Sequence, residues 1–241
     1  NSMIVSLMTL LLVLAFSFSA GYFISRRRFF GRSFIYGYFL LGMVVPTHAW
    51  LLPVFVQFKQ LGILDKRWTL VIPYVAFALP MAVFLIESYI KNIPKEMEES
   101  AVVDGSSILR TLVSIILPLC RPVIATVLIL TFNSSWNEFP FALVLINRSI
   151  LKTVPVALTM FMGAYTTNYP QLMAALCIAV LPVVLVYVAF SKQIVQGMTA
   201  GAVKGHLLFK KSKLPLGDRS WASRRAGKAA ARRARYVPSQ G

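Results

Sequence analysis

Charged side chains are scarce in this sequence of 241 residues, of which Asp, Glu, Lys and Arg make up only 14%. Soluble domains have about 25% charged residues. This scarcity, with 57% hydrophobic residues and a mean hydropathy of +0.70, therefore excludes a water-soluble globular domain. Cysteine is also scarce: Cys120 and Cys177 lie in apolar surroundings and are too few for a disulfide framework or a thiolate metal site. The aromatic content of 12% excludes a disordered chain.

The sequence also lacks the residues that catalytic and cofactor sites need. It contains no G-x-x-x-x-G-K-[ST] phosphate-binding motif and so has no such means of binding ATP. Its two histidines, His48 and His206, are too few and too far apart for a metal or acid–base site. We predict that the chain is not an enzyme and holds no metal and no cofactor. We interpret His48 as a packing residue inside a helix.

Long hydrophobic runs are abundant instead. A membrane-spanning helix needs about 20 mostly apolar residues. Five segments qualify: Met3–Ile24, Ser33–Phe58, Trp68–Ile86, Pro122–Asn147 and Leu172–Ser191. They predict an all-α fold class, a polytopic membrane helix bundle with five visible spans. The apolar stretch Thr153–Tyr165 is too short to span, and we expect it to form a re-entrant or interfacial element.

Basic residues between the spans predict the orientation, because Lys and Arg favour cytoplasmic connections. The first connection carries Arg26–Arg28, and residues 206–241 hold ten Lys/Arg against one acid. These charges place the C-terminus in the cytoplasm and, with five spans, Asn1 outside. An outside N-terminus suggests that a preceding span is missing. We expect residues 206–241 to be a disordered or appended tail, with binding to nucleic acid or anionic lipid as the alternative.

The connection over residues 91–121 is predicted to form a helix–turn–helix protrusion on the cytoplasmic face. Pro94 fits the first turn of a helix, and the acids from Glu96 to Glu99 suit the positive end of a helix dipole. Gly105 fits a left-handed helix stop, and the serines after it are suited to cap the next helix, Ile108–Leu117.

This connection resembles the EAA loop of ABC-importer permeases. The family pattern is Glu-Ala-Ala, three residues, Gly, nine residues and Ile-x-Leu-Pro, and it matches Glu99–Gly105 followed by Ile115–Pro118. The one departure is Ser100, which replaces the first Ala and is nearly as small. The segments Ser135–Ile146 and Gly197–Gly205 are also similar to the smaller permease subunit of the carbohydrate importers, the maltose-type branch. The resemblance covers residues 1–205.

The resemblance implies a six-span permease domain, of which residues 1–205 show five spans, whereas residues 206–241 have no counterpart in the family. It implies an inner-membrane subunit that carries a carbohydrate or related solute into the cytoplasm. The implied partners are a second permease, two ATP-binding subunits that hold the ATP, an extracytoplasmic solute-binding protein and membrane lipid, but no nucleic acid.

The family resemblance also assigns residues that couple the pore to the ATPase. These residues are Glu99, Ser100, Ala101, Asp104 and Gly105. Their small size and charge suit a helix that docks in a cleft of the ATPase. The resemblance further implies that Gly197–Gly205 forms a strand-like end that touches the ATPase.

A carboxylate within the fourth span needs its own explanation, because such groups are costly in a membrane. Trp136, Asn137 and Glu138 together offer a stacking face and hydrogen-bonding groups that suit a sugar in a translocation pathway. The alternative is a hydrogen bond between helices that fixes their packing. A different class of function, a secondary transporter or channel that uses Glu138, is also open at this point, as is the identity of the solute.

Overall fold

The computed structural model describes the backbone of residues 1–163 and 168–212, and the described elements are helical throughout. The chain divides into two units, residues 1–197 and 198–241. The helix α11 (Tyr169–Ser212) crosses this boundary. Of the second unit the structure describes only the helical backbone of residues 198–212, so the architecture below is that of the first unit.

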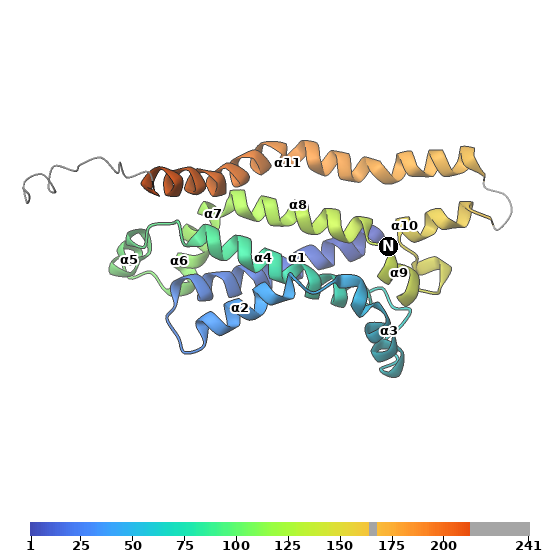
Figure 1. Ribbon diagram of the computed structural model, residues 1–241, viewed down its shortest axis with the longest axis horizontal. Coiled ribbons are helices and arrows are strands. Elements are labelled where there is room, and N and C mark those ends of the chain that lie inside the picture. The colour runs from blue at the N-terminus through green and yellow to red at the C-terminus, as the bar shows by residue number, and fades with distance from the viewer. Residues whose placement is uncertain (164–167, 213–241) are drawn as a thin grey trace, which may run out of the picture. The chain divides into compact units, whose positions relative to one another are not determined.

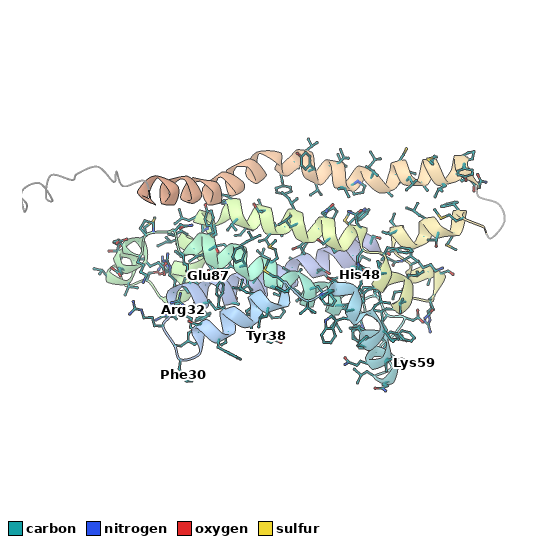
Figure 2. All side chains as sticks on the ribbon, viewed as in Figure 1. Phe30, Arg32, Tyr38, His48, Lys59 and Glu87 are labelled. Atoms are coloured by element: carbon teal, nitrogen blue, oxygen red, sulfur yellow. The ribbon has the colours of Figure 1, made fainter. Side chains whose placement is uncertain are left out.

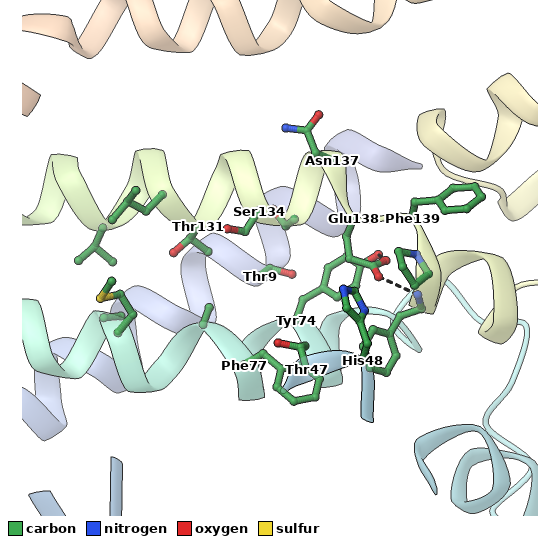
Figure 3. A pocket seen from close by; sticks show the side chains of 18 of the residues that line it. Thr9, Thr47, His48, Tyr74, Phe77, Thr131, Ser134, Asn137, Glu138 and Phe139 are labelled. Carbon is green, nitrogen blue, oxygen red and sulfur yellow. Dashed lines mark hydrogen bonds between the residues drawn. The ribbon is translucent and has the colours of Figure 1, made fainter. Parts of the chain in front are cut away.

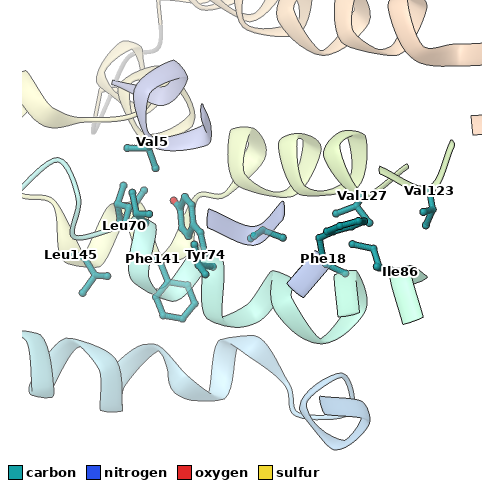
Figure 4. Packing of buried hydrophobic residues seen from close by; sticks show 14 of the residues in the cluster. Val5, Phe18, Leu70, Tyr74, Ile86, Val123, Val127, Phe141 and Leu145 are labelled. Carbon is teal, nitrogen blue, oxygen red and sulfur yellow. The ribbon is translucent and has the colours of Figure 1, made fainter. Parts of the chain in front are cut away.

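Three helices form the centre of the first unit: α1 (Ser2–Arg26), α4 (Val71–Ile90) and α8 (Arg121–Asn137). They run side by side, and α1 packs along both of the others (Figure 1). Buried residues from all three meet in one hydrophobic cluster, where Phe18, Ile86 and Val127 lie together (Figure 4). A close-packed, mainly apolar centre of this kind is what long apolar helices produce when they share a single core.

Close contact between α1 and α4 depends on a glycine. A Cβ atom added at Gly21 would lie 2.8 Å from Ile86 Cγ2 and 3.2 Å from the backbone nitrogen of Glu87. Real Cβ atoms do not approach other atoms that closely. The small residue therefore allows the two backbones to approach, as small residues do between membrane helices.

The predicted span Ser33–Phe58 is not one straight helix. It consists of α2 (Arg32–Gly42), the 3-10 turn η1 (Thr47–Trp50) and α3 (Leu51–Gln60), with a bend of 90°. Pro46 lies in the break, where it has no N–H to continue a helix and disfavours helical backbone before it. None of the α2 residues is buried, and Tyr38 on this helix is 69% exposed (Figure 2).

The predicted span Pro122–Asn147 is also broken. The helix α8 ends at Asn137, Glu138 has extended backbone, and the short helix α9 (Pro140–Leu145) follows. Pro140 at the start of α9 explains the break, because it has no N–H to continue the hydrogen bonds of α8, whereas its fixed φ suits the first turn of a new helix. The position of Glu138 in the apolar run had suggested a place inside a continuous span. The structure places it at a helix break instead.

The predicted helix Ile108–Leu117 is present but not regular. It comprises α6 (Ile108–Thr111), the π-helical segment η2 (Leu112–Ile116) and α7 (Leu117–Leu119). Pro118 cannot donate a backbone hydrogen bond, and the π segment ends two residues before it. A bend of 76° at Cys120 then separates α7 from α8.

Within the described residues, three helices are long and apolar enough to cross a membrane, and the number rises to five if each bent pair is one span. The five predicted spans agree with this larger number. Thr153–Tyr165 is short as expected, since it contains α10 (Val154–Leu158) and the 3-10 turn η4 (Thr159–Phe161). Its last residues, like residues 213–241 of the predicted tail, lie outside the described part.

The prediction that Gly197–Gly205 has a strand-like backbone was wrong, because α11 continues as a helix through these residues to Ser212. No proline follows Pro182 in this helix, so nothing in the sequence forces it to end there.

The two ends of the bundle are different. The short helices α5 (Glu96–Val103) and α6 lie at one end, and α3, α9 and the N-terminus lie at the other (Figure 1). A hydrogen bond also places the N-terminus near the segment that follows α9, because the Asn1 side chain donates to the Ile150 carbonyl over 2.6 Å. The first and third connections thus share an end of the bundle, as the predicted alternation of loops requires.

Candidate functional site

The helix–turn–helix that the sequence predicts in the connection over residues 91–121 is present, and we name its residues 94–109 the α5 loop. The acids Glu96, Glu98 and Glu99 occupy the first turn of α5. Gly105 follows this helix with φ at +77°, and a Cβ added there would meet nothing within 4 Å. Ser107 caps α6, because its hydroxyl accepts a hydrogen bond from the Arg110 N–H over 3.4 Å. The turn therefore needs glycine for its conformation and not for lack of space.

Four of the five predicted coupling residues are exposed: Glu99, Ser100, Asp104 and Gly105. The fifth, Ala101, is 6% exposed and is the one buried residue of α5. Its small side chain packs inward against its own chain, so it is not on the accessible face where the family resemblance would use it.

Apolar side chains surround these exposed residues. Val102 is 60% and Val103 is 86% exposed, and Ile108 and Leu109 at the start of α6 are also exposed. Large apolar residues that stand in water next to one another mark an interaction surface more often than single ones do. The α5 loop therefore offers a mixed apolar and acidic face that the fold itself does not cover.

The inner side of α5 is held by α1. Arg26 and Glu98 form a salt bridge of 2.5 Å, and the Tyr22 hydroxyl donates to the other carboxylate oxygen of Glu98 over 3.0 Å. Sequence reasoning missed this group because Arg26 reads as a loop charge and Glu98 as one acid in a helix-dipole pattern. The spacing of Tyr22 and Arg26, one helical turn apart at the end of an apolar helix, was the available signal.

A second feature is a pocket of about 410 Å³ between the central helices and the two helix breaks. Figure 3 shows His48, Tyr74 and Glu138 around it. Its polar lining comes from α1, η1, α4, α8 and the residue that follows α8. These residues are Thr9, Thr47, His48, Tyr74, Thr131, Ser134, Ser135, Asn137 and Glu138. Hydroxyl, amide, imidazole and carboxylate groups beside Phe77 and Phe139 are suited to a polyhydroxylated solute.

Glu138 is held by three donors. Its carboxylate accepts hydrogen bonds from the N–H groups of Phe141 at 2.7 Å and Ala142 at 3.0 Å, and from the Tyr74 hydroxyl at 2.5 Å. The two N–H groups belong to the first turn of α9, so the carboxylate also lies at the positive end of that helix. Glu138 thus joins α4, α8 and α9 while it lines the pocket.

The other two predicted pathway residues are placed differently from each other. Asn137 lines the pocket, and its amide donates to the carbonyl and the side chain of Asn133. Trp136 is buried and does not line the pocket. Its indole N–H donates to the carbonyl of Ala179 in α11 over 3.1 Å, which is a packing contact between helices.

Sequence reasoning missed the contribution of the second predicted span to this pocket. Thr47 and His48 lie in η1, at the break, and line the pocket instead of packing inside a helix. The signal was present in the sequence, because Pro46 interrupts the apolar run directly before them. Helix breaks in membrane proteins are tolerated where they face a cavity or other protein.

The fold and these features define a polytopic all-α membrane protein with interrupted spans around a polar pocket and an exposed loop at one end. The chain belongs to the family described as binding-protein-dependent transport system inner membrane component, whose profile matches residues 3–200. The predicted resemblance to ABC-importer permeases is thereby confirmed.

Individual relatives agree with the carbohydrate branch. The chain is 36% identical to the trehalose/maltose transport system permease protein MalG of Thermococcus litoralis, over 85% of this chain and 74% of that protein. It is 33% identical to the multiple sugar-binding transport system permease protein MsmG of Streptococcus mutans, over 85% and 75%. The fold matches a chain of a bacterial ABC transporter that imports the acidic polysaccharide alginate, with a TM-score of 0.70, 24% identity, and coverage of 80% and 73%.

Proposed function

We propose that this chain is a membrane-spanning subunit of an ATP-driven importer that carries a carbohydrate or related solute across the inner membrane into the cytoplasm. The names of the relatives support a sugar as the class of solute. In this proposal the chain works with a second permease, two ATP-binding subunits that hold the ATP, and an extracytoplasmic solute-binding protein. The α5 loop and the C-terminus face the cytoplasm.

The observation that carries the proposal is the exposed face of the α5 loop. Glu99 and Ser100 stand beside Val102 and Val103 on a short protruding helix, and the fold leaves all four uncovered. Apolar groups gain from burial in a partner by about 25 cal/mol per Å². A separate subunit that covers this face would therefore be bound firmly enough for its movements to displace the α5 loop. We propose that this subunit is the ATP-binding subunit.

The pocket is the proposed place for the solute. Asn137 and Glu138 offer acceptors and donors there, and His48 and the threonine hydroxyls add to them. Glu138 is less suited to a secondary transporter or channel, because all three of its hydrogen bonds tie it to its own fold. Glu138→Gln should lower solute uptake by reconstituted importer much more than it lowers ATP hydrolysis, and equal small losses of both would contradict a pathway role.

Docking of the α5 loop is tested with two glycines that share a conformation. Gly105 and Gly31 both have positive φ, and both have open space where a Cβ would lie. Valine costs about 1–2 kcal/mol of backbone strain at either position, but only at Gly105 would it also enter the proposed interface. In Gly105→Val, co-purification of the ATP-binding subunits should fall at least about tenfold. A tenfold loss of affinity corresponds to about 1.4 kcal/mol, and overpacking costs about 1–3 kcal/mol in addition to the strain.

Gly31→Val is the matched control and should retain the ATP-binding subunits. Glu99→Lys, which reverses a charge on the proposed interface, should lose them as Gly105→Val does. Normal co-purification and normal stimulation of ATP hydrolysis by the solute-binding protein in both Gly105→Val and Glu99→Lys would overturn the proposed function of the loop.

A further inference from the structure

The end of α1 binds α5 through charged and hydrogen-bonding side chains that are largely buried. Arg26, the last residue of α1, is 6% exposed in its side chain, and its partner Glu98 is 15% exposed. Both oxygens of the Glu98 carboxylate are engaged, one by Arg26 and the other by the Tyr22 hydroxyl. Arg26 also donates to the backbone carbonyl of Ile93, just before α5, over 2.9 Å.

This group joins α5 and the residue before it to the end of α1. The helix has eight residues, and Ala101 is the one that is buried. Glu98 and Ala101 are three residues apart and so share the inner face of the helix. Glu99, Ser100 and Val103 are exposed instead. The two sides of α5 thus have separate roles, one for a partner and one for α1.

The helix α1 connects this group to the pocket. Tyr22 and Arg26 lie at its end, whereas Thr9 of the same helix lines the pocket. With a rise of 1.5 Å per residue, the distance along the helix from Arg26 to Thr9 is about 25 Å. The helix is continuous over this length and packs against both α4 and α8. A displacement of its end therefore shifts the wall of the pocket.

We propose that Arg26, Glu98 and Tyr22 form a clamp that transmits movement of α5 to α1 and, through α1, to the pocket. The inference rests on the proposed docking of an ATP-binding subunit on the α5 loop, and it assigns positioning residues for that coupling. Opposite charges that are shielded from water hold their geometry, because separating them leaves an unpaired buried charge. The helix α5 consequently moves together with α1 and not as an independent loop.

The α1 end offers a matched control. Arg27 is adjacent to Arg26 in the sequence, carries the same charge and is exposed. The variants are Arg26→Gln, Glu98→Gln, the charge exchange Arg26→Glu with Glu98→Arg, the mild change Tyr22→Phe, and the control Arg27→Gln. Each is made in the complete importer, reconstituted in lipid vesicles. The measurements are the amount of co-purified ATP-binding subunit and the rate of ATP hydrolysis with and without the solute-binding protein.

We expect Arg26→Gln and Glu98→Gln to retain the ATP-binding subunits but to lose stimulation by the solute-binding protein by about tenfold, because each leaves one buried charge unpaired. The charge exchange should restore stimulation to within about threefold of the wild type, since the pair is formed again with opposite polarity. Tyr22→Phe should reduce stimulation by about two- to fivefold through loss of one hydrogen bond. Arg27→Gln should behave as the wild type.

Either of two results for the stimulation of ATP hydrolysis would overturn the clamp. One is normal stimulation in both Glu98→Gln and Arg26→Gln. The other is loss of stimulation in the charge exchange as severe as in the single variants, with all three proteins present in the membrane at wild-type levels. Failure of the proposed docking has a different signature, because Gly105→Val and Glu99→Lys would then keep their ATP-binding subunits. Loss of those subunits in Glu98→Gln would place Glu98 in the docking face and would also overturn the clamp.

Discussion

The exposed acids of the α5 loop and the acid of the pocket differ in how they contact their own fold. Among the described residues, the side chains of Glu99 and Asp104 in the loop have no hydrogen bond or ion pair, and both are exposed. Glu138 in the pocket accepts three hydrogen bonds from its own fold. The difference separates an acid that contacts its own fold from acids that remain accessible to the ATP-binding subunit we propose. Changes at the exposed face of the loop should therefore affect assembly, and changes at the pocket should affect stability as well as transport.

The largest effect on stability is expected at a glycine that packs, in contrast to Gly105, which does not. In Gly21→Ala the new Cβ would lie 2.8 Å from Ile86, which is fully buried. Overpacking of this kind costs about 1–3 kcal/mol. We expect a lower yield of folded protein and a lower temperature of unfolding in detergent.

Gly37→Ala is the control for this change. Gly37 is also helical, but a Cβ added there meets nothing within 4 Å. Alanine is favoured over glycine in a helix by about 0.5–1 kcal/mol, so this variant should be at least as stable as the wild type. Equal stability of the two variants would show that α1 and α4 are not closely packed at Gly21.

The next effect concerns Glu138 as a structural residue. Glu138→Ala leaves the first two N–H groups of α9 without their acceptor and should lower the free energy of unfolding by about 1–3 kcal/mol. Glu138→Gln keeps one oxygen acceptor and should cost less. Asn137→Ala is the control from the same pocket, and as an exposed residue it should change stability by less than about 0.5 kcal/mol. Thermal unfolding of the three variants measures the order of their stabilities. A Glu138→Ala variant as stable as Asn137→Ala would show that the hydrogen bonds of Glu138 do not stabilise the fold.

The smallest effect is expected at Asp65, in the connection between α3 and α4. Its carboxylate accepts hydrogen bonds from the N–H groups of Asn147 at 2.5 Å and Arg148 at 3.0 Å, and thereby holds the chain after α9. Partial burial alone would raise the pKa of Asp65, but the hydrogen bonds from Arg148 and Asn147 outweigh it and lower the pKa below the ordinary value of 3.8.

A lowered pKa in the folded state gives stability that is present above the ordinary pKa and is lost as the pH falls through the folded value. The wild type should therefore be more stable than Asp65→Asn by a constant amount between about pH 5 and pH 8. This difference should decrease as the pH falls below 3.8. A difference that does not change with pH would show that the charge of Asp65 has no part in the contact.

The fold class and the α5 loop were predictable because both depend on local patterns. Uncharged runs of about 20 residues indicate membrane helices, and the acids, Gly105 and the following serine indicate the helix–turn–helix. The breaks in two of the spans were not predicted, although Pro46 and Pro140 lie at them. In a water-soluble chain a proline ends a helix, whereas in a membrane neighbouring groups re-satisfy the backbone, so composition alone does not decide between a kink and a break.

The clamp and the pocket were not predictable because they join distant segments. Tyr22 and Glu98 are separated by 76 positions, and Tyr74 and Glu138 by 64. No local period relates such residues. The orientation of Ala101 was misjudged for a related reason, since the motif marks it as small but does not tell which side of α5 faces the bundle.

The most direct test of the account is to identify what covers the α5 loop. A photoreactive benzophenone amino acid is placed at Val103, the most exposed of the large apolar residues of α5, in the importer expressed with all its subunits. The same probe at Tyr38, an exposed residue of α2 in a predicted span, is the control. The account predicts that, after illumination, the probe at Val103 is joined covalently to the ATP-binding subunit and the probe at Tyr38 is not. An assembled importer in which the probe at Val103 forms no product with the ATP-binding subunit would contradict the account.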